Sequence, residues 1–391
     1  MKRFCRHLSF LLVCLMMVLT CLVPQTVRAD DALDESVRKA FKKYRTSGGM
    51  VVVAKDGEIV YQQCYGWADK FNKIKVTEDT CFKLASVSKL VTGLSVMRLV
   101  ELGLLDLDEN IGTYLGDPPY KAANPYFPKI GLTARHLMTH TSSLKSNGSL
   151  QKNRELSEIL NVKKRHTSDF YKEKPGSVYR YNNYGAGIEG CLIEAATGKR
   201  LTEAARELIF DPMGIDAAYH PTLLANPENI VTTYKKNGDI SITRSYRLKE
   251  ECPEEIDLDH DYNDAYGNCW MTCGDLCRIG IMLSDGGWYG GKQILQPETV
   301  EEMMSSQKGK GSVTVDSPYG LNIERVSNLL RGKMLYGHQG LMESVLCNLY
   351  YDPETHFVFA MCTNGCNASK NDRIGNLSRS LFNLMWKQFV Q

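Results

Sequence analysis

The chain has 391 residues, of which 43% are hydrophobic and 24% are charged, with a formal net charge of +2 at neutral pH. This composition excludes a disordered chain and provides material for a large hydrophobic core. The near-neutral balance gives no indication of a nucleic-acid partner. The densest basic cluster, Lys163-Lys164-Arg165, lacks interleaved aromatic residues and is predicted to be a solvated face.

The first 29 residues have the organisation of a secretory signal peptide. Basic residues near the start precede an apolar run from Leu8 to Val23, and Val27-Arg28-Ala29 forms a small-residue cleavage pattern. The run is shorter than the roughly 20 residues of a membrane-spanning helix. We therefore expect a mature protein that acts outside the cytoplasm without stable membrane insertion, an uncleaved anchor being the alternative.

Strands are predicted near both ends of the mature chain. A helical pattern over 32–44 is followed by two β-rich runs around Lys55-Asp56-Gly57, and Asp-Gly between such runs is a strong hairpin signal. From 82 to 290 the pattern is mostly helical. Two further strands flank 352–355, and an amphipathic helix over 376–390 closes the chain.

This order predicts an α+β fold, with one antiparallel sheet made from both ends of the chain and flanked by helices. The predicted division is a signal peptide over 1–29 and one globular domain over 30–391. Within that domain, 30–82 and 291–391 form an α/β lobe, and 83–290 form an inserted, mostly helical lobe.

Ten of the thirteen cysteines lie beyond residue 29. Export permits disulfides, although a core of this size does not need them, and no pairing follows from the sequence. Cys269, Cys273 and Cys277 recur every four residues, which is compatible with a metal site. Because they share a helical stripe with Trp270 and Ile281, we interpret them as small buried hydrophobic residues.

Two other patterns resemble metal sites only in part. His136 and His140 have i, i+4 spacing, but the glutamate of a metalloprotease motif is missing between them, so structural histidines are favoured. Asp257, Asp259 and Asp261 alternate as in the opening of an EF-hand loop, but the glycine and glutamate of that loop are replaced. We expect a solvated loop there and no bound metal.

The segment "FKLASVSKL" places Ser86 three residues before Lys89 at the start of an apolar helix. This spacing brings both side chains to one face of a helix. A desolvated lysine can have a pKa low enough to accept the proton of a serine hydroxyl, and the N–H of Ser86 at the helix start can point toward an oxyanion. Ser88 faces elsewhere and is expected to be structural.

Two further triplets follow in the chain. Tyr181-Asn182-Asn183 stands before an apolar helix, and His338-Gln339-Gly340 lies just before the predicted C-terminal strands. Taken singly, the first would be a turn and the second a surface glycine turn, and Ser-x-x-Lys alone would arise often by chance.

Together and in this order, the three motifs resemble the class C β-lactamase-like family of serine hydrolases, which includes penicillin-binding proteins, D-alanyl-D-alanine carboxypeptidases and esterases. The segments "LMTHTSSL", "DPMGI" and "ILQPETVEEM" are also similar to segments of that family, and the similarity covers nearly all of 33–385. The resemblance implies the β-lactamase-like, serine penicillin-recognising fold.

The resemblance also implies site residues. Ser86 would be the nucleophile, with Lys89 and Tyr181 sharing the proton transfers, and neighbouring cations would lower the pKa of the Tyr181 phenol. Asn183 and His338 would orient the substrate beside Gln339 and Gly340. The backbone N–H groups of Ser86 and Leu341 would stabilise the oxyanion. No metal or organic cofactor is needed.

The expected function is hydrolysis through an acyl-enzyme on Ser86, acting on peptides with D-residues, such as cell-wall peptides, or on small esters and amides. His338 stands where class C β-lactamases have a lysine and is no permanent cation, which argues against efficient β-lactam hydrolysis. The alternatives are a true class C-type β-lactamase and a penicillin- or peptidoglycan-sensing protein that binds without turnover.

Overall fold

The computed structural model describes residues 31–116, 118–146, 154–259, 264–308, 318–367, 369–371 and 374–391. The predicted signal peptide over 1–29 and Asp261 of the acidic loop lie outside these residues. All structural statements below concern the described parts of the chain.

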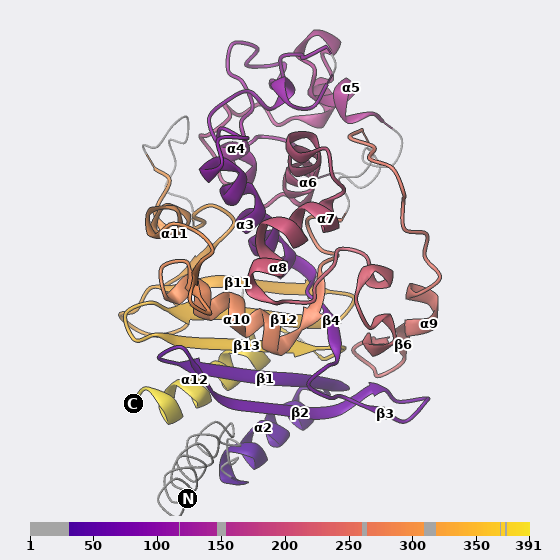
Figure 1. Cartoon of the computed structure of the whole chain (residues 1–391), viewed down its shortest axis with the longest axis vertical. Coiled ribbons are helices and arrows are strands. Elements are labelled where there is room, and N and C mark those ends of the chain that lie inside the picture. The colour runs from indigo at the N-terminus through magenta and orange to yellow at the C-terminus, as the bar shows by residue number, and fades with distance from the viewer. Residues whose placement is uncertain are drawn as a thin grey trace, which may run out of the picture.

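A seven-stranded antiparallel sheet is formed from both ends of the chain, as predicted (Figure 1). The strand order is β10-β11-β12-β13-β1-β2-β3. The strands are β1 (Gly48–Lys55), β2 (Glu58–Asp69), β3 (Ile74–Lys75), β10 (Glu324–Val326), β11 (Leu335–Met342), β12 (Val345–Asp352) and β13 (Phe357–Thr363).

The predicted β1–β2 hairpin turns at Asp56 and Gly57, which both have positive φ, of 53° and 81°. Two consecutive residues in this region define the turn that matches the twist of paired strands. Along β1, Val51 and Val53 pack into one hydrophobic cluster, while Met50 and Val52 pack into another on the opposite face. Burial on both faces explains why this strand is continuously apolar.

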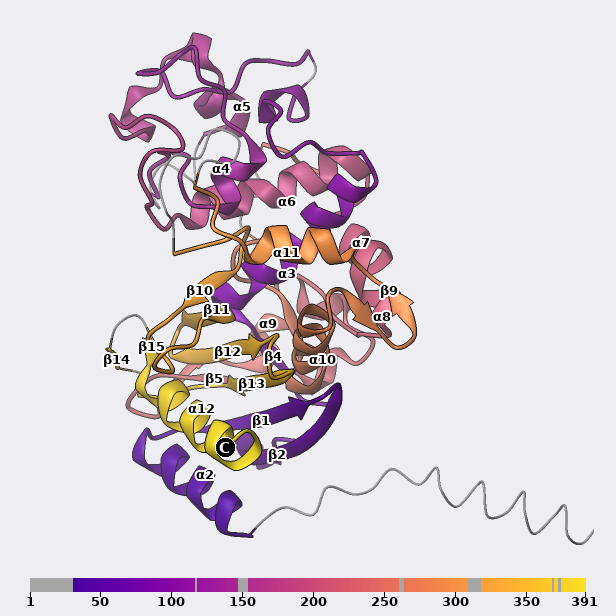
Figure 2. The same cartoon turned by 90° about the vertical axis from the view of Figure 1, so that its left-hand side faces the viewer.

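Helices cover both faces of the sheet (Figure 2). On one face lie α2 (Asp31–Lys43) and α12 (Asn376–Phe389), the two predicted terminal helices. On the other face lies α10 (Cys273–Ser284), so close that a β-carbon on Gly280 would be 2.4 Å from Val358. By sequence α10 falls in the inserted segment, yet it packs on the sheet; the lobe boundaries remain predictions.

The inserted region and its flanks hold the remaining helices and several short strand pairs. The helices are α3 (Ser88–Glu101), α4 (Ala134–Met138), α5 (Leu156–Leu160), α6 (Asn183–Thr197), α7 (Leu201–Ala205), α8 (Asp211–Met213), α9 (Arg244–Arg247) and α11 (Pro297–Met304). The paired strands are β4 (Cys81–Lys83) with β7 (Trp270–Thr272), β5 (Thr233–Tyr234) with β6 (Ile240–Ile242), β8 (Trp288–Tyr289) with β9 (Lys292–Gln293), and β14 (Lys370–Asn371) with β15 (Ile374–Gly375).

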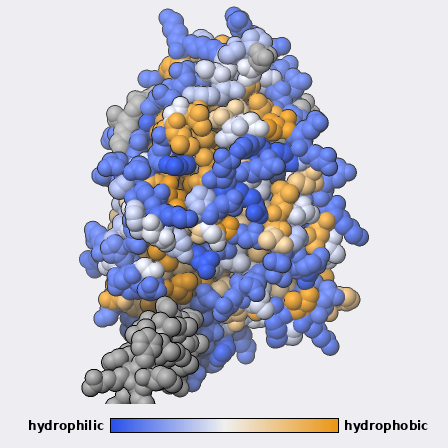
Figure 3. Space-filling view, in the orientation of Figure 1, coloured by the Kyte–Doolittle hydropathy of each residue, from blue (hydrophilic) through white to orange (hydrophobic). Residues whose placement is uncertain are grey.

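Hydrophilic side chains cover most of the face shown in Figure 3. Among the helices described, none is both long and apolar enough to cross a membrane. The basic cluster Lys163-Lys164-Arg165 is exposed, as predicted.

The burial of the cysteines agrees with their interpretation as small hydrophobic residues. Cys269, Cys273 and Cys277 are fully buried in the core, and most of the other cysteines from Cys64 to Cys366 are buried as well. No group of three or more possible metal ligands occurs in the described ranges. In the acidic loop, Asp259 accepts a hydrogen bond from the backbone N–H of Ser157 in the first turn of α5.

Candidate active site

Ser86 lies in a short turn between β4 and α3. The turn, a 3₁₀ helix over Ala85–Val87, runs directly into α3, so Ser86 precedes the first residue of that helix by two positions. Ala85 has φ of 50°, a left-handed conformation that is strained for a residue with a side chain. Such strain is maintained only where the surrounding structure fixes it, and it is often found at functional sites.

Lys89 lies in the first turn of α3 and is fully buried. Its Nζ atom is 3.2 Å from Ser86 Oγ and donates a hydrogen bond of 2.9 Å to the carbonyl of Tyr266. The ring centroid of Tyr181 is 4.9 Å from the same nitrogen. The structure therefore brings Ser86, Lys89 and Tyr181 together, as the sequence predicted.

Burial lowers the pKa of Lys89 to about 7, while the carboxylates of Glu189 and Glu324 act in the opposite direction. A large fraction of Lys89 is then the free amine near neutral pH, although the usual lysine pKa is about 10.4. An amine at hydrogen-bond distance from a hydroxyl, with a pKa near the working pH, can accept its proton.

The start of α6 positions Tyr181 and Asn183. Asn182 is the N-cap of this helix, since its side chain accepts a hydrogen bond from the backbone N–H of Gly185. Asn183 is the first helical residue, and its buried Oδ1 has no hydrogen-bond partner among the described residues. Asn183 lines a cavity at Ser86.

The pKa of Tyr181 differs from the sequence-based expectation. Desolvation raises it, and a hydrogen bond to Ser86 only partly offsets this effect. The expectation that neighbouring cations lower this pKa is wrong, because desolvation dominates and the nearby Glu324 also raises the pKa. Tyr181 therefore carries its proton in the resting site and could donate it.

Strand β11 passes directly beside Ser86. A β-carbon on Gly340 would lie 2.2 Å from the carbonyl oxygen of Leu84 and 2.9 Å from the backbone nitrogen of Ser86. Gln339 and Leu341 line the same cavity as Ser86, but the side-chain oxygen of Gln339 accepts a hydrogen bond from Gly375 N at 2.7 Å. Gln339 thus turns its side-chain oxygen toward the start of α12, and its backbone N–H and carbonyl are hydrogen-bonded to Glu324 and His338.

His338 is fully buried and does not line this cavity. Its Nδ1 lies 2.8 Å from the carbonyl of Gln339, and its Nε2 lies 2.9 Å from the hydroxyl of Tyr319. Burial lowers the pKa of His338 to about 3, assisted by Lys89, so the ring is neutral. The direct substrate contact expected from the sequence is not what this geometry provides, because the ring is buried and both of its nitrogens have partners.

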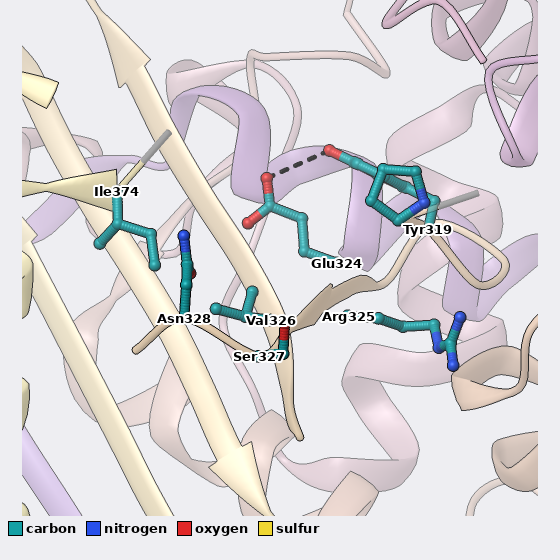
Figure 4. A pocket seen from close by; sticks show the side chains of 8 residues that line it. Tyr319, Glu324, Arg325, Val326, Ser327, Asn328 and Ile374 are labelled. Atoms are coloured by element: carbon teal, nitrogen blue, oxygen red, sulfur yellow. Dashed lines mark hydrogen bonds between the residues drawn. The ribbon is translucent and has the colours of Figure 1, made fainter. Parts of the chain in front are cut away.

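The cavity at Ser86 has a volume of about 620 Å³. Its lining combines the predicted residues with a cation and an anion that the sequence analysis did not identify, Arg180 and Glu324. Glu173 accepts two hydrogen bonds from the Arg180 guanidinium. Glu324 and Tyr319 also line a second cavity of about 320 Å³, shown in Figure 4 with their hydrogen bond.

The aromatic rings of His140, Tyr179, Tyr181 and Tyr319 form a cluster. The His140 ring is 4.6 Å from the ring of Tyr181 and 4.7 Å from that of Tyr319, and the ring of Tyr179 stacks on Tyr319 at 5.6 Å. His140 accepts a hydrogen bond from Asn182 N at 3.3 Å through Nδ1, which gives it a structural role at the start of α6. No motif in the sequence indicated that Tyr319 or Glu324 belongs to the site.

Replacement of Gly340 by alanine is expected to reduce kcat/KM for any substrate that acylates Ser86 by about a hundredfold, because the added methyl group must displace the backbone at Ser86. The rate of Ser86 labelling by a fluorophosphonate measures this loss. Gly274→Ala is the control, since a β-carbon there meets its nearest neighbour at an ordinary 3.7 Å. Equal labelling of the Gly340 variant and wild type would contradict the close approach.

Comparisons with known proteins identify the family of the chain. A sequence profile of the Beta-lactamase family matches residues 31–381. Esterase EstB of Burkholderia gladioli is 31% identical over 216 residues, which are 52% of this chain and 54% of the esterase. A candidate D-alanyl-D-alanine carboxypeptidase of Escherichia coli K12 is 23% identical over 80% of this chain and 77% of that protein.

Among solved structures, the octameric penicillin-binding protein homologue from Pyrococcus abyssi superimposes with a TM-score of 0.69. The superposition covers 91% of this chain and 77% of that one at 21% identity, which supports the fold. The chain belongs to the β-lactamase family of serine hydrolases. Its fold is the β-lactamase and penicillin-binding protein fold, as the resemblance implied.

Proposed function

We propose that the protein is a hydrolase of D-amino-acid peptides or of small esters and amides, acting through an acyl-enzyme on Ser86. The observation that carries the proposal is the 3.2 Å approach of the fully buried Lys89 amine to Ser86 Oγ, at the base of a 620 Å³ cavity. A cavity of this size accommodates a small peptide or ester.

In the proposed mechanism, Ser86 Oγ attacks the substrate carbonyl while its proton passes to Lys89. The backbone N–H groups of Ser86 and Leu341 stabilise the oxyanion, and Tyr181 gives a proton to the leaving group. Asn183 holds the acyl-side carbonyl. Water then hydrolyses the ester on Ser86, with Lys89 and Tyr181 returning to their first protonation states.

Within the proposed class, the charges of the cavity favour esters and amides without a free carboxylate over β-lactams and peptides that end in a carboxylate. The neutral, buried His338 supplies no cation for a substrate carboxylate, and Arg180 is already paired with Glu173. The N-terminal sequence adds the proposal that the protein is exported to the cell envelope, where peptides with D-residues occur.

A matched substrate panel tests this proposal. We expect turnover of p-nitrophenyl butyrate and a preference of at least about tenfold for D-alanine p-nitroanilide over its L-isomer. Diacetyl-Lys-D-Ala-D-Ala is the peptide in the panel, and nitrocefin is the β-lactam. Rapid hydrolysis of nitrocefin with no turnover of the others would replace the proposal with a β-lactamase, and adducts without any turnover would replace it with a sensor.

A further inference from the structure

A buried polar pair lies one helical turn beyond Lys89. Gly93 is four residues after Lys89 on α3, so both face the same side of that helix. A β-carbon on Gly93 would be 2.7 Å from the side chain of Asn322. The Asn322 amide in turn donates a hydrogen bond to Oε2 of Glu189 on α6, and we call these two residues the Glu189–Asn322 pair.

The Glu189–Asn322 pair is a costly arrangement for a protein interior. Both residues are fully buried, and Oε1 of Glu189 and Oδ1 of Asn322 have no hydrogen-bond partner among the described residues. Asn322 has φ of 55°, and its backbone N–H donates to the carbonyl of Met138. Packed apolar side chains at these two positions would avoid the desolvation and the strain.

The charges facing Lys89 indicate what the pair does. Glu324 lines the cavity, and its carboxylate accepts a hydrogen bond from Tyr319 (Figure 4). It also accepts hydrogen bonds from Tyr350 and from the backbone N–H of Gln339. Burial also keeps five neighbouring rings neutral, since it lowers the pKa of the histidines and raises that of the tyrosines: His140, His338, Tyr181, Tyr219 and Tyr266. Asp264 lies near Tyr219 and Tyr266, whereas the acids that act on Lys89 itself are Glu189 and Glu324. Of these two, Glu189 is fully buried and can balance a charge on Lys89.

We infer that Glu189 is a positioning residue for the reaction at Ser86, supplying from beneath Lys89 the counter-charge for the ammonium that Lys89 becomes. This inference rests on the proposed function. During acylation the Ser86 O–H bond breaks, its proton goes to Lys89 Nζ, and Oγ bonds to the carbonyl carbon as the C=O electron pair moves to oxygen. The ammonium forms in a dry site, where a nearby anion stabilises it most.

This arrangement predicts how the rate of acylation of Ser86 depends on pH. Burial raises the pKa of Glu189 to about 8, while Asn322 and Lys89 act in the opposite direction. Burial lowers the pKa of Lys89 to about 7. As pH rises, the lysine first becomes a free amine and Glu189 then becomes an anion, so the acylation rate of the wild type rises in two steps rather than one.

The test measures the rate at which a fluorophosphonate labels Ser86 between pH 5.5 and 9.5. Glu189→Gln keeps the shape and the hydrogen bond to Asn322 but removes the negative charge. We expect this variant to lose the upper step, so that its rate at pH 9 falls by about tenfold relative to wild type. Glu194→Gln is the matched control, because Glu194 is buried on the same helix and accepts a hydrogen bond from Leu201 N, away from Lys89.

Asn322→Gly provides a second variant with an intact carboxyl group. Glycine adopts the left-handed conformation without strain, so this variant should fold. Loss of the amide donor raises the pKa of Glu189, so the upper step moves to higher pH by about one unit. A purely structural pair would lower the unfolding temperature without moving either step.

The outcomes separate the two proposals. If the wild type is not labelled at any pH, the proposed function fails and this inference fails with it. If the wild type is labelled but Glu189→Gln keeps the wild-type profile, the inference about Glu189 is overturned and the proposed function stands. A lost upper step in Glu189→Gln, with Glu194→Gln unchanged, supports the inference.

Discussion

Ser86→Ala is expected to abolish covalent labelling by both a fluorophosphonate and a fluorescent penicillin. The side chain at this position is the hydroxyl that lies 3.2 Å from the buried amine of Lys89, at the cavity base. Without that oxygen no acyl bond can form, so substrate turnover falls by more than about 10⁴-fold. Intact mass of the treated proteins measures the adduct, with one probe molecule expected on wild type and none on the variant.

Ser88→Ala is the matched control for this experiment. Ser88 is fully buried, and its Oγ accepts a hydrogen bond of 3.0 Å from the backbone N–H of Cys269. Its removal leaves a buried donor unpaired, which costs about 1–3 kcal/mol of stability, but labelling should persist. A Ser86→Ala protein that still gains one adduct would show that the nucleophile lies elsewhere.

The sheet could be predicted because the signals for its hairpins come from residues that are close together along the chain. An Asp-Gly turn between β-rich runs defines the β1–β2 hairpin, and the strands flanking 352–355 follow from a similar pattern. The position of α10 could not be predicted in this way, because the apolar stripe of a helix does not indicate which surface of the protein it packs against. The contacts of α10 with β1, β12 and β13, including the close approach at Gly280, show that it packs on the sheet.

The same distinction holds for the site. Ser86 and Lys89 are three residues apart, so helix geometry alone brings them together. Glu189 and Asn322 are 133 residues apart, and neither belongs to a short motif, so only the tertiary structure brings them together beneath Lys89. The residues that flank them in the sequence form no motif that predicts a chemical role.

His338 shows a further limit of motif-based prediction. The His-x-Gly triplet located the correct strand, and Gly340 does lie against Ser86. The role of the histidine depends on Tyr319, which comes from another segment and occupies its Nε2 atom. A triplet on a strand therefore predicts the backbone position better than the function of each side chain.

Lys89→Met is expected to lower the labelling rate of Ser86 by about 10³-fold while leaving the fold intact. Methionine has similar length and suits a fully buried site, so the variant loses the base without opening a cavity. Burial lowers the native pKa of Lys89 to about 7 from its usual 10.5, so the unfolded chain binds more protons between those values. The wild type should then gain stability as pH rises through this window, by up to about 1.4 kcal/mol per pH unit, and Lys89→Met should lack this contribution.

Lys83→Met separates catalysis from burial in this prediction. Lys83 is also buried, and burial lowers its pKa to about 8, but it lies on β4 before the turn that carries Ser86. Both variants should lose part of the pH dependence of stability in denaturant unfolding, because each removes a buried amine. Of the two variants, only Lys89→Met should lose labelling, because it removes the amine that lies 3.2 Å from Ser86 Oγ. Wild-type labelling of Lys89→Met would mean that another group accepts the proton.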